Sequence, residues 1–394
     1  MAFTLIITET AIMVQNKGII FKQVPQELPV PGKDLTVEVR EFDLEQAPPA
    51  GGVTTKNFYA SFDPYQRGRM RPANVKSYSP PFTLGEPITN AAVCKVIKSD
   101  HPNFKAGDLI FGGQVPTEEY SALAKPYADM MRKLNNTHNL DPVHFLGALG
   151  MPGLTAYSSF YEIGKPVKGE TIFISSAAGA VGQLVGQLAK HEGLKVIGSV
   201  GSEEKSEFIT KELGFDAAFN YKKESPKDAL KRLAPDGIDI YYENVGGEHL
   251  EAALEAMNNF GRIIACGMIS EYNKPEGERY GIKNMMYVVA KRLTMRGFIV
   301  GDKDMGPLHV KARDENVAKW LADGSFKAKV SVTEGIENGP DGLIGMLQGN
   351  NFGKAVLKIA DIEKAVAQAP KRPYAAVNSS AISPQKNPDP SVWG

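Results

Sequence analysis

Residues 171–191, with the sequence TIFISSAAGAVGQLVGQLAKH, carry the pattern that decides the fold. The run 171–175 is apolar, as in a buried strand, and the apolar stretch 181–191 is long enough for a helix. Small residues lie between them at 177–182. Glycines there let the backbone turn tightly and approach a pyrophosphate, whose charge is stabilised by the free N–H groups and the dipole of the helix start. The segment therefore predicts a strand, a phosphate-binding turn and a helix.

The spacing of this turn departs from G-x-G-x-x-G, because Ala177 occupies the first glycine position. Small residues for close helix packing would explain such a match if it stood alone. It stands instead at the start of an alternation of strands with helices such as 202–213, which favours the dinucleotide interpretation. The further strands are expected at residues 195–199, 217–220, 238–242, 262–266 and 295–300. The pattern predicts an α/β protein with a doubly wound parallel sheet, the Rossmann fold.

A β-rich unit is predicted before this sheet, because short strand-like runs at 37–40, 91–97 and 108–111 are broken by Pro and Gly. After about Asp302 the chain is too short for a third core, so we expect it to return to this first unit. Its expected elements are a helix at 314–321, a strand at 327–332, a helix at 339–347 and a strand at 354–359. The predicted domains are 1–145 and 306–368 for the β-rich catalytic domain, 146–305 for the nucleotide-binding domain, and 369–394 for a Pro-rich tail.

The end of the second predicted strand bears on the choice of cofactor. An acidic residue there binds the free ribose 2′-hydroxyl of NAD, but this chain has Gly198 and Ser199. The next helix opens at Ser202, a suitable N-cap, and Lys205 lies in its first turn, where the helix dipole disfavours a cation. We interpret Lys205 as a ligand of a 2′-phosphate, with Tyr221 in range from the third strand. The alternatives are a solvated Lys205 paired with a neighbouring Glu and an ordinary half-buried Tyr221.

Two loops should line the same crevice, since ligands of open α/β sheets bind beyond the carboxyl ends of the strands. Residues 243–247 follow the fourth strand and residues 266–272 follow the fifth. Asn244 can bind a ribose or an amide, or it can stabilise the turn before two glycines.

Composition and charge weigh against several classes of function. The chain has 45 basic and 45 acidic side chains with both signs interspersed, which does not favour a nucleic-acid partner. No apolar run reaches the roughly 18 to 20 residues that cross a bilayer, and the first residues lack a basic region, so neither a membrane nor secretion is expected. The 2 Cys lie far apart in sequence, which indicates a reducing compartment, and we expect a cytoplasmic protein.

The chemistry that remains is hydride transfer. The six His do not pair with another His or with Cys at metal-ligand spacing, so no metal site is predicted. No G-x-S-x-G motif supports a serine nucleophile. Hydride transfer without a metal needs a cofactor, a dry cleft and one polar group for the charge that develops on a carbonyl oxygen.

Several segments together resemble the zinc-independent medium-chain dehydrogenase/reductase superfamily. The resemblance is to the group of prostaglandin reductases, leukotriene hydroxydehydrogenases and NADPH-dependent alkenal double-bond reductases. The segments are 56–70, 150–157, 177–182, 244–247 with 266–273, and 351–354. The resemblance implies a GroES-like β-rich catalytic domain, interrupted by the Rossmann domain and completed by the C-terminal segment. It also implies NADPH as cofactor, a small unsaturated carbonyl compound as substrate, and a homodimer.

The resemblance also implies roles for individual residues. Tyr272 matches a cleft tyrosine thought to assist the developing enolate, and Tyr59 matches one near the substrate. Packing inside the β-rich domain is the alternative for Tyr59. The residues implied to hold NADPH are Gly179, Ala180, Val181, Gly182, Lys205, Tyr221, Asn244, Cys266, Gly267, Met268, Ile269, Ser270, Tyr272, Phe298, Ile299, Val300 and Asn351. The chain departs from the family near 72–84 and 300–310, which flank the expected substrate cleft.

The leading hypothesis is NADPH-dependent reduction of the carbon–carbon double bond in α,β-unsaturated aldehydes or ketones. Hydride would reach the β-carbon, and Tyr272 would assist the enolate. One alternative is a quinone reductase or a dehydrogenase of hydroxylated lipids. Another, from a different class, is an inactive NADPH-binding interaction protein. The physiological substrate and the stereochemistry do not follow from the sequence.

Overall fold

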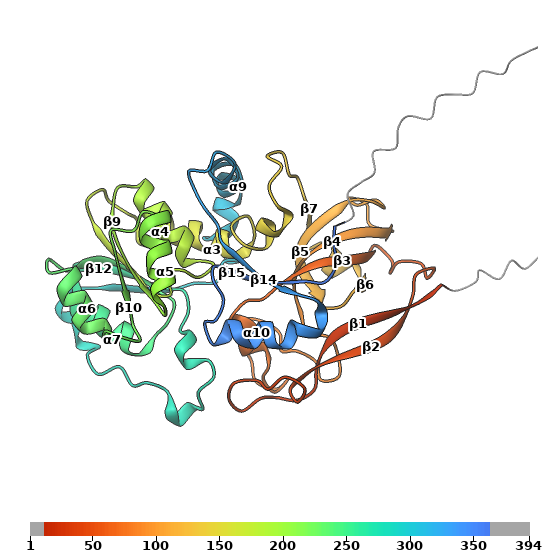
Figure 1. Ribbon diagram of the computed structural model, residues 1–394, viewed down its shortest axis with the longest axis horizontal. Helices are drawn as coiled ribbons and strands as arrows, with labels where there is room; N and C mark the ends of the chain where they lie inside the picture. The colour runs from red at the N-terminus through yellow and green to blue at the C-terminus, as the bar shows by residue number, and fades with distance from the viewer. Residues whose placement is uncertain (1–11, 363–394) are drawn as a thin grey trace, which may run out of the picture. The chain divides into compact units, whose positions relative to one another are not determined.

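A six-stranded parallel sheet forms around the glycine turn in the computed structural model (Figure 1). Its neighbouring strands are all parallel and lie in the order β10-β9-β8-β11-β12-β13. This is the 3-2-1-4-5-6 order of the Rossmann fold, so the predicted fold class is confirmed. The strands are β8 (Thr171–Ile174), β9 (Lys195–Val200), β10 (Ala217–Asn220), β11 (Ile238–Glu243), β12 (Met257–Ala265) and β13 (Thr294–Gly297).

Helices cover the parallel sheet and bury its apolar strands. On one face, Phe173 of β8 stacks on Tyr241 of β11 with ring centroids 5.0 Å apart. Leu230 and Leu254 belong to the same buried cluster, so two of the helices pack on this face. Strands buried on both faces read as continuous apolar runs, which is why 171–175 could be recognised. The helices are α3 (Met151–Ser159), α4 (Gly182–His191), α5 (Glu203–Glu207), α6 (Pro226–Leu233), α7 (Gly247–Ala256) and α8 (Met286–Ala290).

Several predicted elements differ from the structure; the helix expected at 314–321 begins at Gly306, and the strand expected at 262–266 begins at Met257. The strand expected at 295–300 ends at Gly297, because the Ile299 amide donates to Asp302 and the Gly306 amide donates to the Val300 carbonyl, which turns the chain. The helix expected at 202–213 is α5 followed by a π-helical turn, Phe208–Glu212. The strand expected at 327–332 begins only at Val330.

A second sheet has the order β14-β15-β3-β4-β5-β7, with β6 also paired to β3. Strands β14 and β15 come from the C-terminal segment, and β15 pairs with β3 in antiparallel register, so the chain returns to this sheet. The strands are β3 (Val53–Ser61), β4 (Thr89–Ser99), β5 (Leu109–Pro116), β6 (Tyr120–Leu123), β7 (Met131–Lys133), β14 (Val330–Glu334) and β15 (Lys354–Lys358). The hairpin of β1 (Met13–Phe21) and β2 (Leu35–Asp43) forms a separate sheet. The remaining α-helices are α1 (Tyr65–Arg69), α2 (Lys125–Ala128), α9 (Gly306–Ala322) and α10 (Gly339–Leu347).

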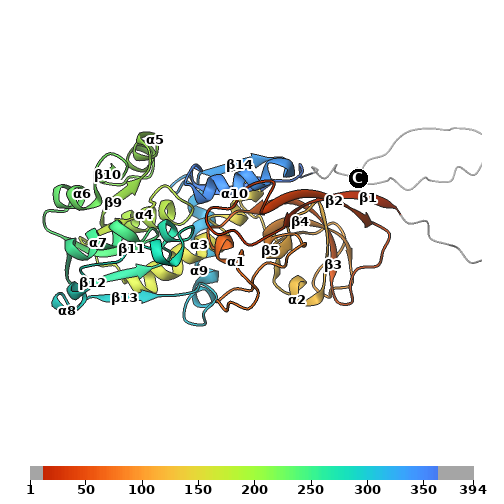
Figure 2. The same cartoon turned by 90° about the horizontal axis from the view of Figure 1, so that it is seen from below.

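The two large sheets meet at the glycine turn. In Figure 2 the parallel-sheet half, with β9 to β13, lies on the left, and β3, β4 and β5 lie on the right. Gly353, just before β15, forms a parallel bridge with Gly179, and its amide donates to the Ala178 carbonyl at 3.0 Å. Two glutamine side chains of α4 hydrogen-bond to the backbone of residues 327–329. Gln183 donates to the Lys329 carbonyl and accepts from the Lys329 amide, and Gln187 does the same with Lys327. These side-chain bonds replace the strand pairing that the sequence had predicted at 327–329.

The structure describes residues 12–362. The chain divides into Met1–Asp361 and Ile362–Gly394, and the description here concerns the first unit alone. The predicted Pro-rich tail, residues 369–394, lies outside the described residues. Within residues 12–362, no helix combines the length and apolar character that crossing a membrane requires.

Candidate functional site

The glycine turn leaves its backbone open at the start of α4. A Cβ on Gly182 would lie 2.5 Å from the Ser176 carbonyl oxygen, so no larger residue fits there without a backbone shift. Ser176 itself has a φ of 51°, a left-handed conformation that shapes the turn. No described side chain caps the N-terminus of α4. Gly179, Ala180 and Val181 are half-buried, so their backbone is accessible to a ligand. This cradle fits a pyrophosphate held by backbone N–H groups.

Two side chains flank Gly201, at the carboxyl ends of β9 and β10. A Cβ placed on Gly201 would lie 3.2 Å from the Tyr221 hydroxyl oxygen and 3.5 Å from Lys222 Cε. Lys205 follows on α5, and burial, then the charge of Lys222, lowers its pKa. Tyr221 is exposed. Two cations and a phenol at this edge of the sheet are suited to a phosphate monoester.

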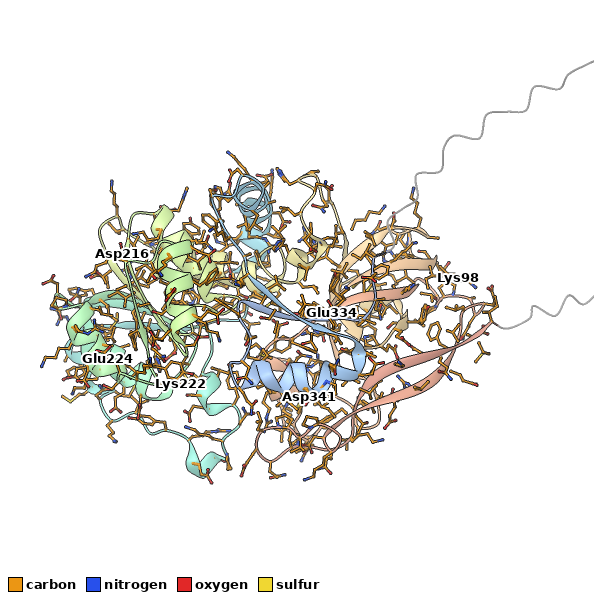
Figure 3. The ribbon with its side chains drawn as sticks, in the orientation of Figure 1. Lys98, Asp216, Lys222, Glu224, Glu334 and Asp341 are labelled. Atoms are coloured by element: carbon orange, nitrogen blue, oxygen red, sulfur yellow. The ribbon has the colours of Figure 1, made fainter. Side chains whose placement is uncertain are left out.

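The sequence analysis did not single out Lys222. This residue lies just after the end of β10 (Figure 3). The signal was available, because Lys222 follows Tyr221 at the same sheet edge. Ser202 is confirmed as the N-cap of α5, since its side chain accepts from the Lys205 amide. The Lys205 ammonium does not pair with a Glu among residues 12–362. It donates to the Gly349 carbonyl at 2.7 Å, while Glu203 pairs with Lys223.

The loop between α10 and β15 forms one wall beside the glycine turn. Asn351 is half-buried and donates its amide to the Gly353 carbonyl at 2.7 Å. Because Gly353 is bridged to Gly179, Asn351 lies close to the turn that would hold the pyrophosphate. The sequence prediction for Asn351 thus has a suitable location in the structure.

Two further loops are joined beneath the site. Asn244 donates its side-chain amide to the Ser175 carbonyl at 2.8 Å, which is the turn-stabilising role considered for it, and this bond leaves its Oδ1 unused. The amides of Ile269 and Ser270 donate to the carbonyls of Asn244 and Val245 at 3.1 and 3.0 Å. Residues 243–247 and 266–272 therefore form one unit at the sheet edge. The Cys266 thiol faces this region and burial raises its pKa to about 12.

Glu243, at the end of β11, is a buried carboxyl that sequence reasoning passed over. Its Oε1 accepts from the Val245 and Gly246 amides at 2.6 and 2.8 Å and from the Tyr241 hydroxyl at 2.8 Å. Its Oε2 has no hydrogen-bond partner in the described part of the chain. Burial raises the pKa of this carboxyl.

The side chain of Tyr272 folds back onto its own loop, residues 266–272. Its hydroxyl oxygen accepts from the Met268 amide at 3.2 Å and would lie 3.0 Å from a Cβ on Gly267. Burial raises the pKa of Tyr272 to about 12. The phenol is therefore a hydrogen-bond donor at neutral pH. Phe298 and Val300 are half-buried, Ile299 is exposed, and all three follow β13 at the same edge of the sheet.

Tyr78 lies near Tyr272, and the place of Tyr59 near the substrate stays a prediction. The charges that act on Tyr59 are those of Asp141, Lys358, Glu334 and Asp361, none of which belongs to the loop of Tyr272. Tyr78, in contrast, contributes to raising the pKa of both Tyr65 and Tyr272.

Tyr65 is the first residue of α1, shortly after β3, and donates to Asn90 Oδ1 at 2.6 Å. Tyr65 lies inside the Asp63-Pro64-Tyr65 segment that carried the resemblance. This membership was the signal in the sequence that could have identified Tyr65 as a site residue. Tyr78 lies in the stretch 72–84, where the chain departs from the family, and sequence reasoning had no signal for it.

Among residues 12–362, no three His, Cys, Asp or Glu side chains gather in a way that could hold a metal ion. The donor set that a catalytic zinc requires, three such ligands around one point, is therefore not assembled in this part of the chain.

Comparisons with known proteins give a consistent result. The model of the family described as zinc-binding dehydrogenase matches residues 180–312, and the model described as the N-terminal domain of oxidoreductase matches residues 17–129. An NADP-dependent oxidoreductase of Cochliobolus heterostrophus is 55% identical over 350 residues, which cover 89% of this chain and 99% of that protein. A 2-alkenal reductase (NADP(+)-dependent) of Nicotiana tabacum is 42% identical, covering 88% of this chain and 98% of its own.

Solved structures agree with these relatives. The crystal structure of CurA in complex with NADPH, from Vibrio vulnificus, has a TM-score of 0.79 and 32% sequence identity. The match covers 88% of this chain and 100% of that chain.

Proposed function

Since this chain belongs to the zinc-binding dehydrogenase family, in its medium-chain group of NADP-dependent oxidoreductases, we propose that it reduces the carbon–carbon double bond of α,β-unsaturated aldehydes and ketones. NADP-dependent oxidoreduction is common to the group, and NADPH is the cofactor of this chain. The similarity to a 2-alkenal reductase supports this substrate class.

The observation that carries the proposal is the state and place of Tyr272. Its phenol lies in the loop joined to Asn244, and Tyr78 is near both this phenol and that of Tyr65. With a pKa of about 12 the phenol holds its proton at neutral pH. A phenol of this kind can donate a hydrogen bond to a carbonyl oxygen that gains negative charge.

The residues of the glycine turn and of the Gly201 cluster fit the cofactor. The backbone of 179–182 would hold the pyrophosphate, and Lys205, Tyr221 and Lys222 would hold the 2′-phosphate. When bound, NADPH would supply a hydride to the electron-poor β-carbon of the substrate. Tyr272 would stabilise the enolate oxygen through its hydrogen bond, and the α-carbon would take a proton from Tyr272 or from water. The family name refers to zinc, but residues 12–362 do not assemble the ligands of a zinc site.

A substrate panel tests the proposal. The purified chain is mixed with NADPH and an enal, an enone, a quinone or a ketone, and NADPH consumption is followed by absorbance. We expect the enal and the enone to be reduced fastest, with the saturated carbonyl compound as product. Faster reduction of the quinone or the ketone would replace the proposal with a quinone reductase or an alcohol dehydrogenase. NADPH binding without turnover of any electrophile would indicate an inactive binding protein.

The homodimer expected from the resemblance stays a prediction. Sedimentation of the purified chain at several concentrations checks it.

A further inference from the structure

One hydrogen bond joins α1 directly to the loop of Tyr272. Arg67 Nε donates to Asn273 Oδ1 at 2.9 Å, between residues 206 positions apart in the chain. Asn273 follows Tyr272 directly, and Arg67 lies two residues after Tyr65. The bond therefore connects the two segments that bring phenols to the candidate site.

Arg67 is held on its other side as well. Its Nη2 donates to the carbonyls of Glu27 and Pro25 at 2.7 and 3.4 Å. The side chain is buried, and no carboxylate within residues 12–362 forms an ion pair with it. A planar guanidinium that donates in two directions cannot shift without losing one set of bonds. Arg67 is thus a fixed point from which Asn273 is held.

Near its end, the loop of Tyr272 is also held by Glu271, whose Oε2 accepts from the Tyr280 amide at 2.8 Å, but this bond does not reach α1. Its first half is tied to residues 244–245 by the backbone bonds of Ile269 and Ser270. The Tyr272 amide makes only a long bond, 3.4 Å, to the Ile269 carbonyl. Its hydroxyl bond to Met268 is within the same loop, so it does not fix the loop relative to α1.

We propose that Arg67 is a positioning residue for the reduction, which through Asn273 sets the place of Tyr272 relative to Tyr65. This inference rests on the proposed function. A catalytic donor works only when it is held close to its productive geometry, and a misplacement of about 1 Å can lower a rate about a hundredfold. The bond between Arg67 and Asn273 supplies that restraint from the β-rich half of the chain.

The variant Asn273→Ala tests the proposal, because Asn273 is half-buried on a loop and its truncation should leave the fold intact. We expect kcat for an enal to fall about tenfold, with the Kd for NADPH changed less than about twofold. Asn273→Asp keeps the acceptor oxygen, so it should restore most of kcat. Arg67→Lys should lower kcat as well, and the double variant Arg67→Lys with Asn273→Ala should be no slower than the slower single variant.

The control variant is Asn258→Ala. The Asn258 side-chain amide donates to Asp239 Oδ1 at 2.8 Å, near the start of β12, and the variant loses this hydrogen bond. It should leave kcat unchanged. Additive losses in the double variant, or an unchanged kcat in Asn273→Ala, would overturn the positioning role.

Hydrogen exchange separates this inference from the proposed function. The amides of residues 268–272 should exchange faster in Asn273→Ala than in the wild-type chain, both free and with NADP⁺ bound. This readout does not depend on turnover. If the wild-type chain reduces no enal, the proposed function fails while exchange still reports on the link. Unchanged exchange rates would overturn the link itself.

Discussion

The ammonium of Lys205 lies 2.7 Å from the carbonyl oxygen of Gly349, across a separation of 144 residues. Lys205 belongs to the parallel-sheet half, and Gly349 opens the loop that leads into β15. Lys205, which we assign to the 2′-phosphate, thus also contacts the loop between α10 and β15, and this loop lies beside the pyrophosphate turn. A backbone carbonyl is a weaker partner for an ammonium than a phosphate, so the phosphate should compete well for Lys205.

Lys205→Ala should weaken NADPH binding and leave NADH binding nearly unchanged. A lost charge-assisted hydrogen bond to phosphate amounts to about 1 to 3 kcal/mol, which corresponds to a Kd roughly 5 to 150 times higher. Titration of the nicotinamide fluorescence with both cofactors measures the effect.

Two matched lysines sharpen that experiment. Lys222→Ala should weaken NADPH in the same direction, because Lys222 flanks Gly201 with Tyr221. Lys223→Ala should not, because its ammonium pairs with Glu203 on the surface. Equal losses for NADPH and NADH in Lys205→Ala would contradict the phosphate assignment.

Gly182→Ala should abolish cofactor binding. The added Cβ would lie 2.5 Å from the Ser176 carbonyl oxygen and 2.8 Å from Ala177 Cα, so the turn itself must move. The matched control is Gly345→Ala, where the nearest atom to the new Cβ is 3.8 Å away. Gly345 lies within α10, and alanine there should raise the free energy of unfolding by about 0.5 to 1 kcal/mol. NADPH binding and thermal unfolding of both variants check the pair, and tight binding by Gly182→Ala would rule out the cradle.

Tyr272→Phe should lower kcat by about a hundredfold and leave NADPH affinity nearly intact, the size of effect found when one donor to a developing oxyanion is removed. Because the pKa of Tyr272 is about 12, its donor form persists below that pH, and its titration should produce no fall in kcat between about pH 6 and 9. Steady-state kinetics with an enal over this range give both answers. An unchanged kcat in the variant would remove Tyr272 from the reaction.

Local pattern was enough to predict the parallel sheet. The run 172–174 is apolar and fully buried, and the turn at 177–182 is short enough to recognise by spacing. Ser202 could be predicted as an N-cap because capping depends on neighbouring residues alone. The end of the strand at Gly297 could not be predicted, since it depends on amide bonds to Asp302 and Val300 further along the chain.

The candidate site was harder to predict because it is assembled from distant segments. Lys222 and Tyr221 meet Lys205 only through the order of the strands, and Tyr78 approaches Tyr272 from a loop with no recognised motif. Tyr59 was assigned from resemblance, and its place near the substrate stays a prediction. Tyr78 acts on both Tyr65 and Tyr272, and this relationship arises only in the folded chain.

The buried carboxyl of Glu243 makes stability depend on pH. Burial raises its pKa in the folded chain above the ordinary value of 4.5, although the amides of Val245 and Gly246 partly offset the shift. A group whose folded-state pKa is raised contributes its stabilisation below the unfolded-state pKa and loses it as the pH rises through the folded-state pKa. The wild-type chain should therefore lose this contribution as the pH rises above about 4.5.

Glu243→Gln removes the titration and keeps a carbonyl oxygen that can accept from the same amides. The melting temperature of the variant relative to that of the wild-type chain should therefore rise as the pH increases from about 4.5 to 8. Thermal unfolding of both chains in a series of buffers measures the difference. The orphaned Oε2 supports this direction, because an ionised oxygen without a partner is the form that burial disfavours. A difference that stays constant, or that shrinks toward high pH, would mean that Glu243 is ionised and stabilised in the folded chain by its four donors, which include the Ser175 hydroxyl.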